Sequence, residues 1–98
     1  MRFVWDKRKA QTNLGKHGVR FENAARVFDD PLTFSIQHRI VKGEERWITI
    51  GTVDGIVVLV VAHTVYEDQG QEVIRIISAR KATPRERRIY AAQIEGIE

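Results

Sequence analysis

The fold of this chain is constrained most strongly by two strand-like segments that are joined by Asp54-Gly55. Residues 45–53 and 56–66 are rich in Val, Ile and Thr, which are residue types that favour strands. Asp and Gly both tolerate the positive φ that a two-residue type I′ turn requires. The sequence therefore predicts an antiparallel hairpin. Its second strand is predicted to be central in the sheet because it is apolar on both faces for most of its length.

Turn and capping residues divide the rest of the chain into predicted helices and strands. Asp6 is a good N-cap for a short helix, and Gly18 after Lys16-His17 is typical of a helix end. Residues 83–86, Thr-Pro-Arg-Glu, form a capping box with Pro at the first helical position. The other predicted elements are strands over 3–5, 32–38 and 72–80, and helices over 7–16, 22–29 and 84–94.

This order of elements predicts an α+β fold, a mainly antiparallel β-sheet with two short N-terminal helices and a C-terminal helix. A chain of 98 residues suits a single domain over residues 1–98 with one modest core. The absence of cysteine excludes disulfides, thiolate catalysis and Cys-based metal sites. No run approaches the roughly 20 apolar residues of a membrane span, and the first residues lack a signal-peptide pattern. We therefore expect a cytoplasmic location.

Hairpin pairing predicts which side chains share a face of the sheet. If Asp54-Gly55 form the whole loop, Val53 pairs with Ile56 and Arg46 lies opposite His63. Residues directly opposite each other on neighbouring strands have Cβ atoms about 5 Å apart. The first hairpin is therefore expected to bring an arginine beside a histidine.

The second hairpin extends this prediction to a third strand. A three-residue loop over 68–70 places Arg75 opposite His63 as well. Two fixed cations beside an imidazole bind phosphate and favour its neutral form, which can act as a general base. We expect the row Arg46, His63 and Arg75. The alternative is that all three residues lie at the sheet margin, with the arginines paired to Glu44, Glu45 or Glu72.

The net charge of +3, from 16 Lys and Arg and 13 Asp and Glu, is unevenly distributed. Residues 75–88 carry six basic side chains and one acidic one, a net +5, so the rest of the chain carries −2. Concentrated positive charge is typical of surfaces that bind nucleic-acid phosphates. The alternatives are a solvated helix face or a patch that binds an acidic protein partner.

The remaining polar and aromatic residues limit which kinds of catalytic or binding site the chain can form. No pair of His or carboxylate residues has metal-ligand spacing, and there is no glycine-rich phosphate loop, so we expect no metal site and no cofactor. His17 is more simply a cap on a helix dipole than a catalytic group. The roles of Tyr66 and Tyr90 stay open, because a Tyr near a basic patch can stack on a base or donate a hydrogen bond to a phosphate. A metal-free nuclease would favour RNA over DNA, because RNA supplies its own nucleophile, the 2′-hydroxyl.

Two groups of residues, one towards each end of the chain, together form a pattern that is specific to one protein family. They are Trp5-Asp6, Lys9, Asn13, Lys16-His17-Gly18-Val19, Phe21-Glu22, Ala25, Val27-Phe28 and Asp30-Pro31, and then Gly43-Glu44, Arg46, Gly51, Arg75-Ile76-Ile77-Ser78-Ala79-Arg80, Glu86 and Tyr90. The chain resembles the BrnT family of bacterial toxins in these positions. The family often has a basic residue shortly after the Thr of its central strand. Here Thr64 is followed by Val65 and Tyr66, so the role of that position passes to Tyr66 or is lost.

The resemblance implies a RelE-like fold and a ribonuclease toxin that arrests translation without a metal ion. It also implies a neutralising ribbon-helix-helix antitoxin, BrnA, whose complex with the toxin binds its own promoter DNA. The expected catalytic residues are Arg75 and Arg80, which bind the phosphate and stabilise its charge, with His63 as the base and Arg46 as a further candidate. The expected RNA-binding residues are Lys16, His17, Lys81, Arg85, Arg88, Tyr66 and Tyr90. The alternative function is a non-catalytic module that binds protein or DNA in a repressor complex.

Overall fold

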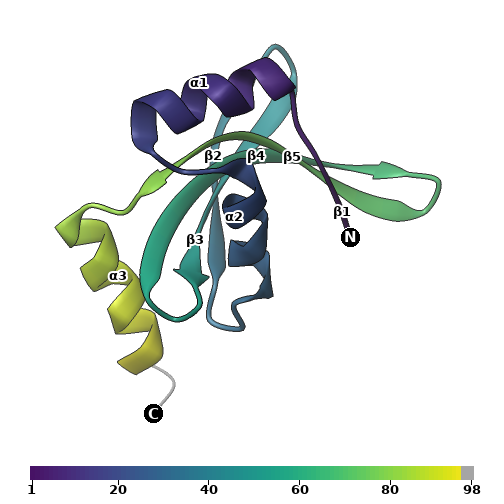
Figure 1. The fold of residues 1–98 in the computed structure, drawn as a ribbon. Coiled ribbons are helices and arrows are strands. Elements are labelled where there is room, and N and C mark those ends of the chain that lie inside the picture. Colours follow the sequence, from purple (N-terminus) through teal and green to yellow (C-terminus); the bar gives the residue numbers. More distant parts are fainter. Residues whose placement is uncertain (96–98) are drawn as a thin grey trace.

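The computed structural model describes residues 1–95 and has the predicted α+β class (Figure 1). Five strands form one sheet in the order β1-β5-β4-β3-β2, with β1 and β5 parallel and the other neighbours antiparallel. Within the described residues no helix is both long and apolar enough to cross a membrane. In chain order the elements are β1 (Arg2–Val4), α1 (Lys7–His17), α2 (Phe21–Arg26), the 3-10 turn η1 (Val27–Asp29), β2 (Phe34–Val41), β3 (Glu44–Val53), β4 (Val57–Asp68), β5 (Gln71–Lys81) and α3 (Pro84–Glu95).

Side-chain caps begin α1 and α3 as the sequence predicts. The Asp6 carboxylate accepts hydrogen bonds from the backbone N–H groups of Arg8 and Lys9, at 2.8 and 3.1 Å. At α3 the capping box is reciprocal, because the Thr83 N–H donates to the Glu86 carboxylate at 2.9 Å and the Glu86 N–H donates to the Thr83 hydroxyl at 3.2 Å. These bonds satisfy backbone donors that a helix start otherwise leaves unpaired. The helix predicted over 22–29 is present as two shorter segments, α2 and η1.

The main core lies between the sheet and the two N-terminal helices, which pack on one face (Figure 1). Phe21, Ala24 and Val27 contribute from α2 and η1, and each is completely buried. They pack on strand residues such as Val61 and Ile76, which are at most 1% exposed. A smaller cluster lies on the other face, where Tyr90 of α3 packs against Ile50 and Val60. The sheet is therefore covered on one face by α1 and α2, and α3 covers only part of the other face.

Asn13 closes the free edge of β5, which pairs with β1 only over Val73–Arg75. Its side-chain amide donates to the Ala79 carbonyl at 2.8 Å and to the Val19 carbonyl at 3.0 Å, and its oxygen accepts from the Ala79 N–H at 3.0 Å. The amide thus replaces the hydrogen bonds of a neighbouring strand at one residue of the sheet edge. Because Asn13 is only 6% exposed, these bonds are shielded from water.

The β3–β4 hairpin has one more loop residue than predicted. Asp54 and Gly55 do adopt positive φ angles, 58° and 69°, and the Ile56 N–H donates to the Val53 carbonyl at 3.2 Å. Ile56 stays in the loop, however, and Val53 pairs with Val57. The predicted pairing of the two strands is therefore wrong by one residue.

The β4–β5 hairpin has one loop residue fewer than predicted. Gln69 and Gly70 form the loop with φ angles of 52° and 79°, and Asp68 pairs with Gln71. The sequence predicted that Asp68 belongs to a three-residue loop. A non-glycine residue takes the left-handed conformation here, which sequence patterns rarely indicate.

These two differences overturn the predicted row of Arg46, His63 and Arg75. His63 pairs with Trp47 on β3 and with Ile76 on β5. Side chains of successive strand residues point to opposite faces, so Arg46 and Arg75 lie on the face opposite to His63. The two arginines still share a face with each other, because both shifts are of one residue.

Candidate functional site

The sheet face opposite to α1 and α2, called here the open face, carries a polar row across four strands. Arg75 on β5 pairs with Thr64 on β4, and Arg39 on β2 pairs with Arg46 on β3. The antiparallel β3–β4 register, continued by one residue past its last pair, places Arg46 opposite Thr64. Three arginines and a threonine thus replace the row predicted around the histidine.

Arg39 is a member of this row that sequence reasoning missed. The β2–β3 hairpin has a two-residue loop, Lys42-Gly43, in which both residues have positive φ angles of 51° and 79°. Val41 therefore pairs with Glu44, and Arg39 with Arg46. Gly43 is a turn signal in the sequence, and the same pairing rule applied to a two-residue loop there identifies Arg39.

Glu44 contacts two arginines of the row, Arg75 and Arg46. Its Oε1 forms an ion pair with Arg75, and the Arg46 Nε lies 3.7 Å from the same oxygen. The side chains of Glu44 and Arg75 are 40% and 43% exposed, so solvent reaches both groups. This pairing is the alternative to a phosphate site that the sequence left open. Arg39 adds a third positive charge. The three arginines of the row and Glu44 together carry a net charge of +2.

Two polar atoms of the row are buried without a hydrogen-bond partner among the described residues. They are the Arg46 Nε and the Thr64 Oγ1. A distance of 3.7 Å from Arg46 to Glu44 is too long for a hydrogen bond. Buried polar atoms in proteins are usually paired, and exceptions often lie where a ligand or water binds. The row therefore has spare donor capacity between its charged ends.

A β-bulge on β5 brings Arg80 to the same face as Arg75. Residues five apart on a regular strand point to opposite faces. Here His63 pairs with Ile76 and the preceding residue of β4, Ala62, pairs with Ser78, so Ile77 is the extra residue of the bulge. The bulge reverses the alternation once. As a result the two arginines that the sequence singled out share the open face.

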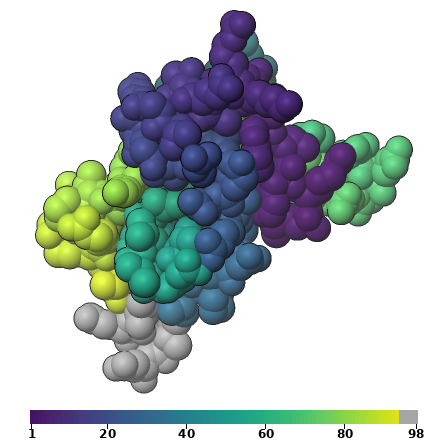
Figure 2. Space-filling model, viewed as in Figure 1, coloured from purple at the N-terminus to yellow at the C-terminus, as the bar shows by residue number. Residues whose placement is uncertain are grey.

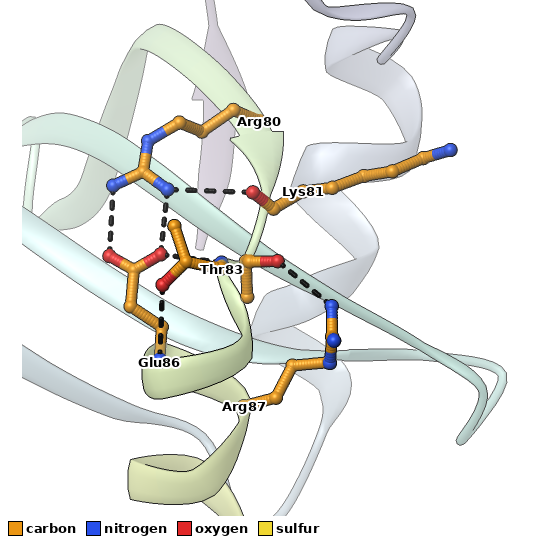
Figure 3. A network of polar contacts seen from close by, with 6 residues as sticks. Arg80, Lys81, Thr83, Glu86 and Arg87 are labelled. Atoms are coloured by element: carbon orange, nitrogen blue, oxygen red, sulfur yellow. Dashed lines mark hydrogen bonds and ion pairs between the residues drawn. The ribbon is translucent and has the colours of Figure 1, made fainter.

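Arg80 is fixed beside the start of α3 (Figure 3). Its guanidinium donates two hydrogen bonds to the Glu86 carboxylate, at 2.7 and 2.9 Å. Hydrogen bonding from Arg80 lowers the pKa of Glu86 to about 2, and the bond to Glu86 raises the pKa of Arg80. The Arg80 side chain stays 41% exposed, so its outer edge can still contact an anion.

His63 lies in the core beneath the helices and does not reach the open face. It is 2% exposed, its Nε2 lies 2.6 Å from the Thr49 hydroxyl, and its ring packs edge-on against Phe28 with centroids 5.0 Å apart. Burial lowers the pKa of His63, because the charged imidazolium is poorly solvated there. His63 therefore does not lie beside Arg46 and Arg75, where the sequence predicts it as the general base.

The two tyrosines differ in what they can contact. Tyr66 is 46% exposed, and it lies two residues after Thr64 on β4, so it faces the same side as the row. It belongs to the β4–β5 hairpin, whose tip projects beyond the rest of the molecule (Figure 2). Tyr90 is 6% exposed, and its hydroxyl donates to Asp30 at 2.5 Å. Burial and this hydrogen bond raise the pKa of Tyr90. Tyr90 therefore anchors α3, whereas Tyr66 is available at the surface.

The remaining predicted RNA-binding residues lie on three separate elements. Lys16 and His17 end α1 beside a shallow pocket that Ser78 of β5 also lines. Lys81 is the last residue of β5. Exposed positions on α3 hold Arg85 and Arg88. These five residues are not part of the row.

The carboxylates of Glu44 and Glu86 each contact an arginine. Within residues 1–95, no three His, Asp or Glu side chains come together in a way that could hold a metal ion. The open face carries groups that can bind an anion, namely guanidinium donors and one partly exposed carboxylate that contacts two of them.

Two of three comparisons with known proteins found a similarity. Residues 5–86 match the sequence model of a family described as "Ribonuclease toxin, BrnT, of type II toxin-antitoxin system". A crystal structure of the Brucella abortus ribonuclease toxin BrnT superposes with a TM-score of 0.64 and 26% sequence identity, over 85% of this chain and 97% of that one. A search of curated proteins found no match.

Proposed function

The chain belongs to the BrnT family, the ribonuclease toxins of type II toxin–antitoxin systems, and we propose that it cleaves RNA on its open face without a metal ion. The observation that carries this proposal is the row of arginines around Thr64, with Arg80 brought to the same face by the bulge. RNA cleavage needs a phosphate held in place and its developing negative charge neutralised. Guanidinium groups perform both tasks.

The proposed reaction is an internal transesterification. The 2′-hydroxyl of RNA attacks the adjacent phosphorus, and the 5′-oxygen of the next nucleotide leaves. Arg46 and Arg75 bind the non-bridging oxygens, where charge increases in the transition state. For this the phosphate displaces part of the Arg75 contact with Glu44. The products are a 2′,3′-cyclic phosphate and a 5′-hydroxyl.

Other residues are assigned to binding and not to the reaction. Arg80, held by Glu86, contacts a neighbouring phosphate, and Tyr66 stacks on a base. The RNA backbone is attracted by the long-range charge of four side chains, Lys16, Lys81, Arg85 and Arg88. His17, beside Lys16 at the end of α1, is a further contact. His63 and Tyr90 take structural roles in this scheme, because both are buried.

The biological role proposed for the chain follows from its family. It cleaves cytoplasmic RNA and thereby arrests translation until an antitoxin neutralises it. The antitoxin is a BrnA-like protein of the ribbon-helix-helix type, and the complex binds promoter DNA through that protein. The type II class of the family supports a protein antitoxin, and the basic open face suits an acidic segment of such a partner.

RNA cleavage by the purified protein in EDTA tests the proposed function. We expect an RNA oligonucleotide to be cut to products with 2′,3′-cyclic phosphate ends, and a DNA strand of the same sequence to stay intact because it lacks the nucleophile. Cleavage that occurs only after a divalent metal is added would overturn the metal-free reaction. RNA that stays intact under both conditions favours the non-catalytic binding module.

A further inference from the structure

We propose that Glu44 is the general base of the reaction, the group that takes the proton from the attacking 2′-hydroxyl. The proposal rests on the ribonuclease function proposed above. It assigns a role that the sequence had given to His63. Glu44 contacts both arginines that are proposed to hold the phosphate.

Local structure fixes the Glu44 carboxylate at this position. Glu44 is the first residue of β3 after the Lys42-Gly43 loop, and it lies two residues before Arg46, so both side chains are on the open face. In the described part of the chain, both ion pairs of Glu44 use Oε1. Its other oxygen, Oε2, is therefore left to accept a proton.

The geometry places the base next to the reacting atoms. A phosphate bound by Arg46 and Arg75 lies against the side chain that both arginines contact, which is Glu44. The 2′-hydroxyl is on the ribose attached to that phosphate. A general base must reach the proton it removes, either directly or through one water molecule. Glu44 meets this requirement because it lies against both arginines that bind the phosphate.

The proton and bond changes balance without any further reagent. The 2′-hydroxyl proton moves to Glu44 Oε2 as the bond from the 2′-oxygen to phosphorus forms. The bond from phosphorus to the 5′-oxygen breaks, and this oxygen takes a proton from water. Glu44 then returns its proton to solvent. The arginines neutralise the negative charge on the phosphorus centre throughout.

Other candidate bases near the row are less suitable. Glu86 accepts three hydrogen bonds, two from Arg80 and one from the Thr83 N–H, and with a pKa of about 2 it is a weak base. Glu45 pairs with Ile40 and lies on the opposite face to Glu44. His63 is buried beneath the helices.

The test compares Glu44→Gln with Glu45→Gln, two neighbouring glutamates on opposite faces of β3. Cleavage is measured in single-turnover reactions with RNA, and binding is measured separately with 2′-O-methyl RNA, which lacks the nucleophile. We expect E44Q to cleave about 100-fold more slowly or worse while binding the analogue at least as tightly as wild type. E45Q is expected to match wild type in both measurements, and thermal melting checks that both variants fold.

Each other outcome has a distinct meaning. An E44Q protein that cleaves within about threefold of the wild-type rate overturns the general-base role. Parallel losses of cleavage and of analogue binding would assign Glu44 to positioning Arg75, and would also overturn it. A wild-type protein that leaves RNA intact contradicts the ribonuclease function itself, and the role of Glu44 with it.

Discussion

Replacing Arg75 with alanine is expected to slow RNA cleavage by about 100-fold or more, because a fixed donor to the transition-state charge is lost. Arg75 lies on the open face opposite Thr64 and is oriented by its ion pair with Glu44. Arg75→Lys should recover only part of the rate, since an ammonium group cannot make the two parallel hydrogen bonds of a guanidinium. The measurement is the single-turnover cleavage rate of each purified variant.

Arg26→Ala is the matched control for this prediction. Arg26 also forms an ion pair, with Asp54, and its side chain is 48% exposed compared with 43% for Arg75. It lies at the end of α2, on the helix-covered side of the sheet. We expect this variant to cleave RNA at the wild-type rate. Equal rates for the Arg75 and Arg26 variants would place the reaction elsewhere on the molecule.

The largest effect on stability is expected for Asn13→Ala, which should lower the free energy of unfolding by about 2–4 kcal/mol. The substitution removes three hydrogen bonds and leaves the N–H and carbonyl of Ala79 without partners in a buried position. Unpaired buried groups cost more than the bonds themselves contribute. Urea denaturation followed by circular dichroism measures the change.

Gln11→Ala controls for the loss of a polar side chain from the same helix. Gln11 is exposed on α1, so its removal should change the free energy of unfolding by less than about 0.5 kcal/mol. A similar small effect for Asn13→Ala would mean that the edge of β5 is held by other contacts. The comparison therefore isolates the bonds that Asn13 makes to the sheet.

Local signals predicted the elements of this fold well, because each depends on residues close in sequence. The Asp6 cap, the Thr83–Glu86 capping box and the positive φ at Asp54-Gly55 all occur as predicted. Each of these is decided within about four residues of the chain. The RelE-like relationship and the single domain over residues 1–98 stay predictions.

Strand register was harder to predict, because a difference of one loop residue moves every side chain to the other face. Ile56 joins the first loop, and Asp68 leaves the second. Both loop lengths are compatible with the turn residues present, so the sequence does not decide between them. His63 was consequently placed with the arginines, although it lies in the core.

The sequence correctly predicts that Arg46 and Arg75 share one face of the sheet, although the strand pairing from which it does so is wrong. Two errors of one residue cancel for Arg46 and Arg75, which lie on either side of Thr64 instead of His63. Arg80 shares their face only because of the bulge at Ile77. That position carries no Gly or Pro to signal a bulge, so the sequence could not indicate it.

The most direct test of an RNA site on the open face is to observe which arginines contact RNA. In an NMR titration of the arginine-labelled protein with 2′-O-methyl RNA, side-chain Nε–Hε signals report on each guanidinium separately. We expect the signals of Arg46 and Arg75 to shift on binding while the signal of Arg26 stays in place. Shifts at Arg26 with no change at Arg46 and Arg75 would contradict an RNA site on the open face.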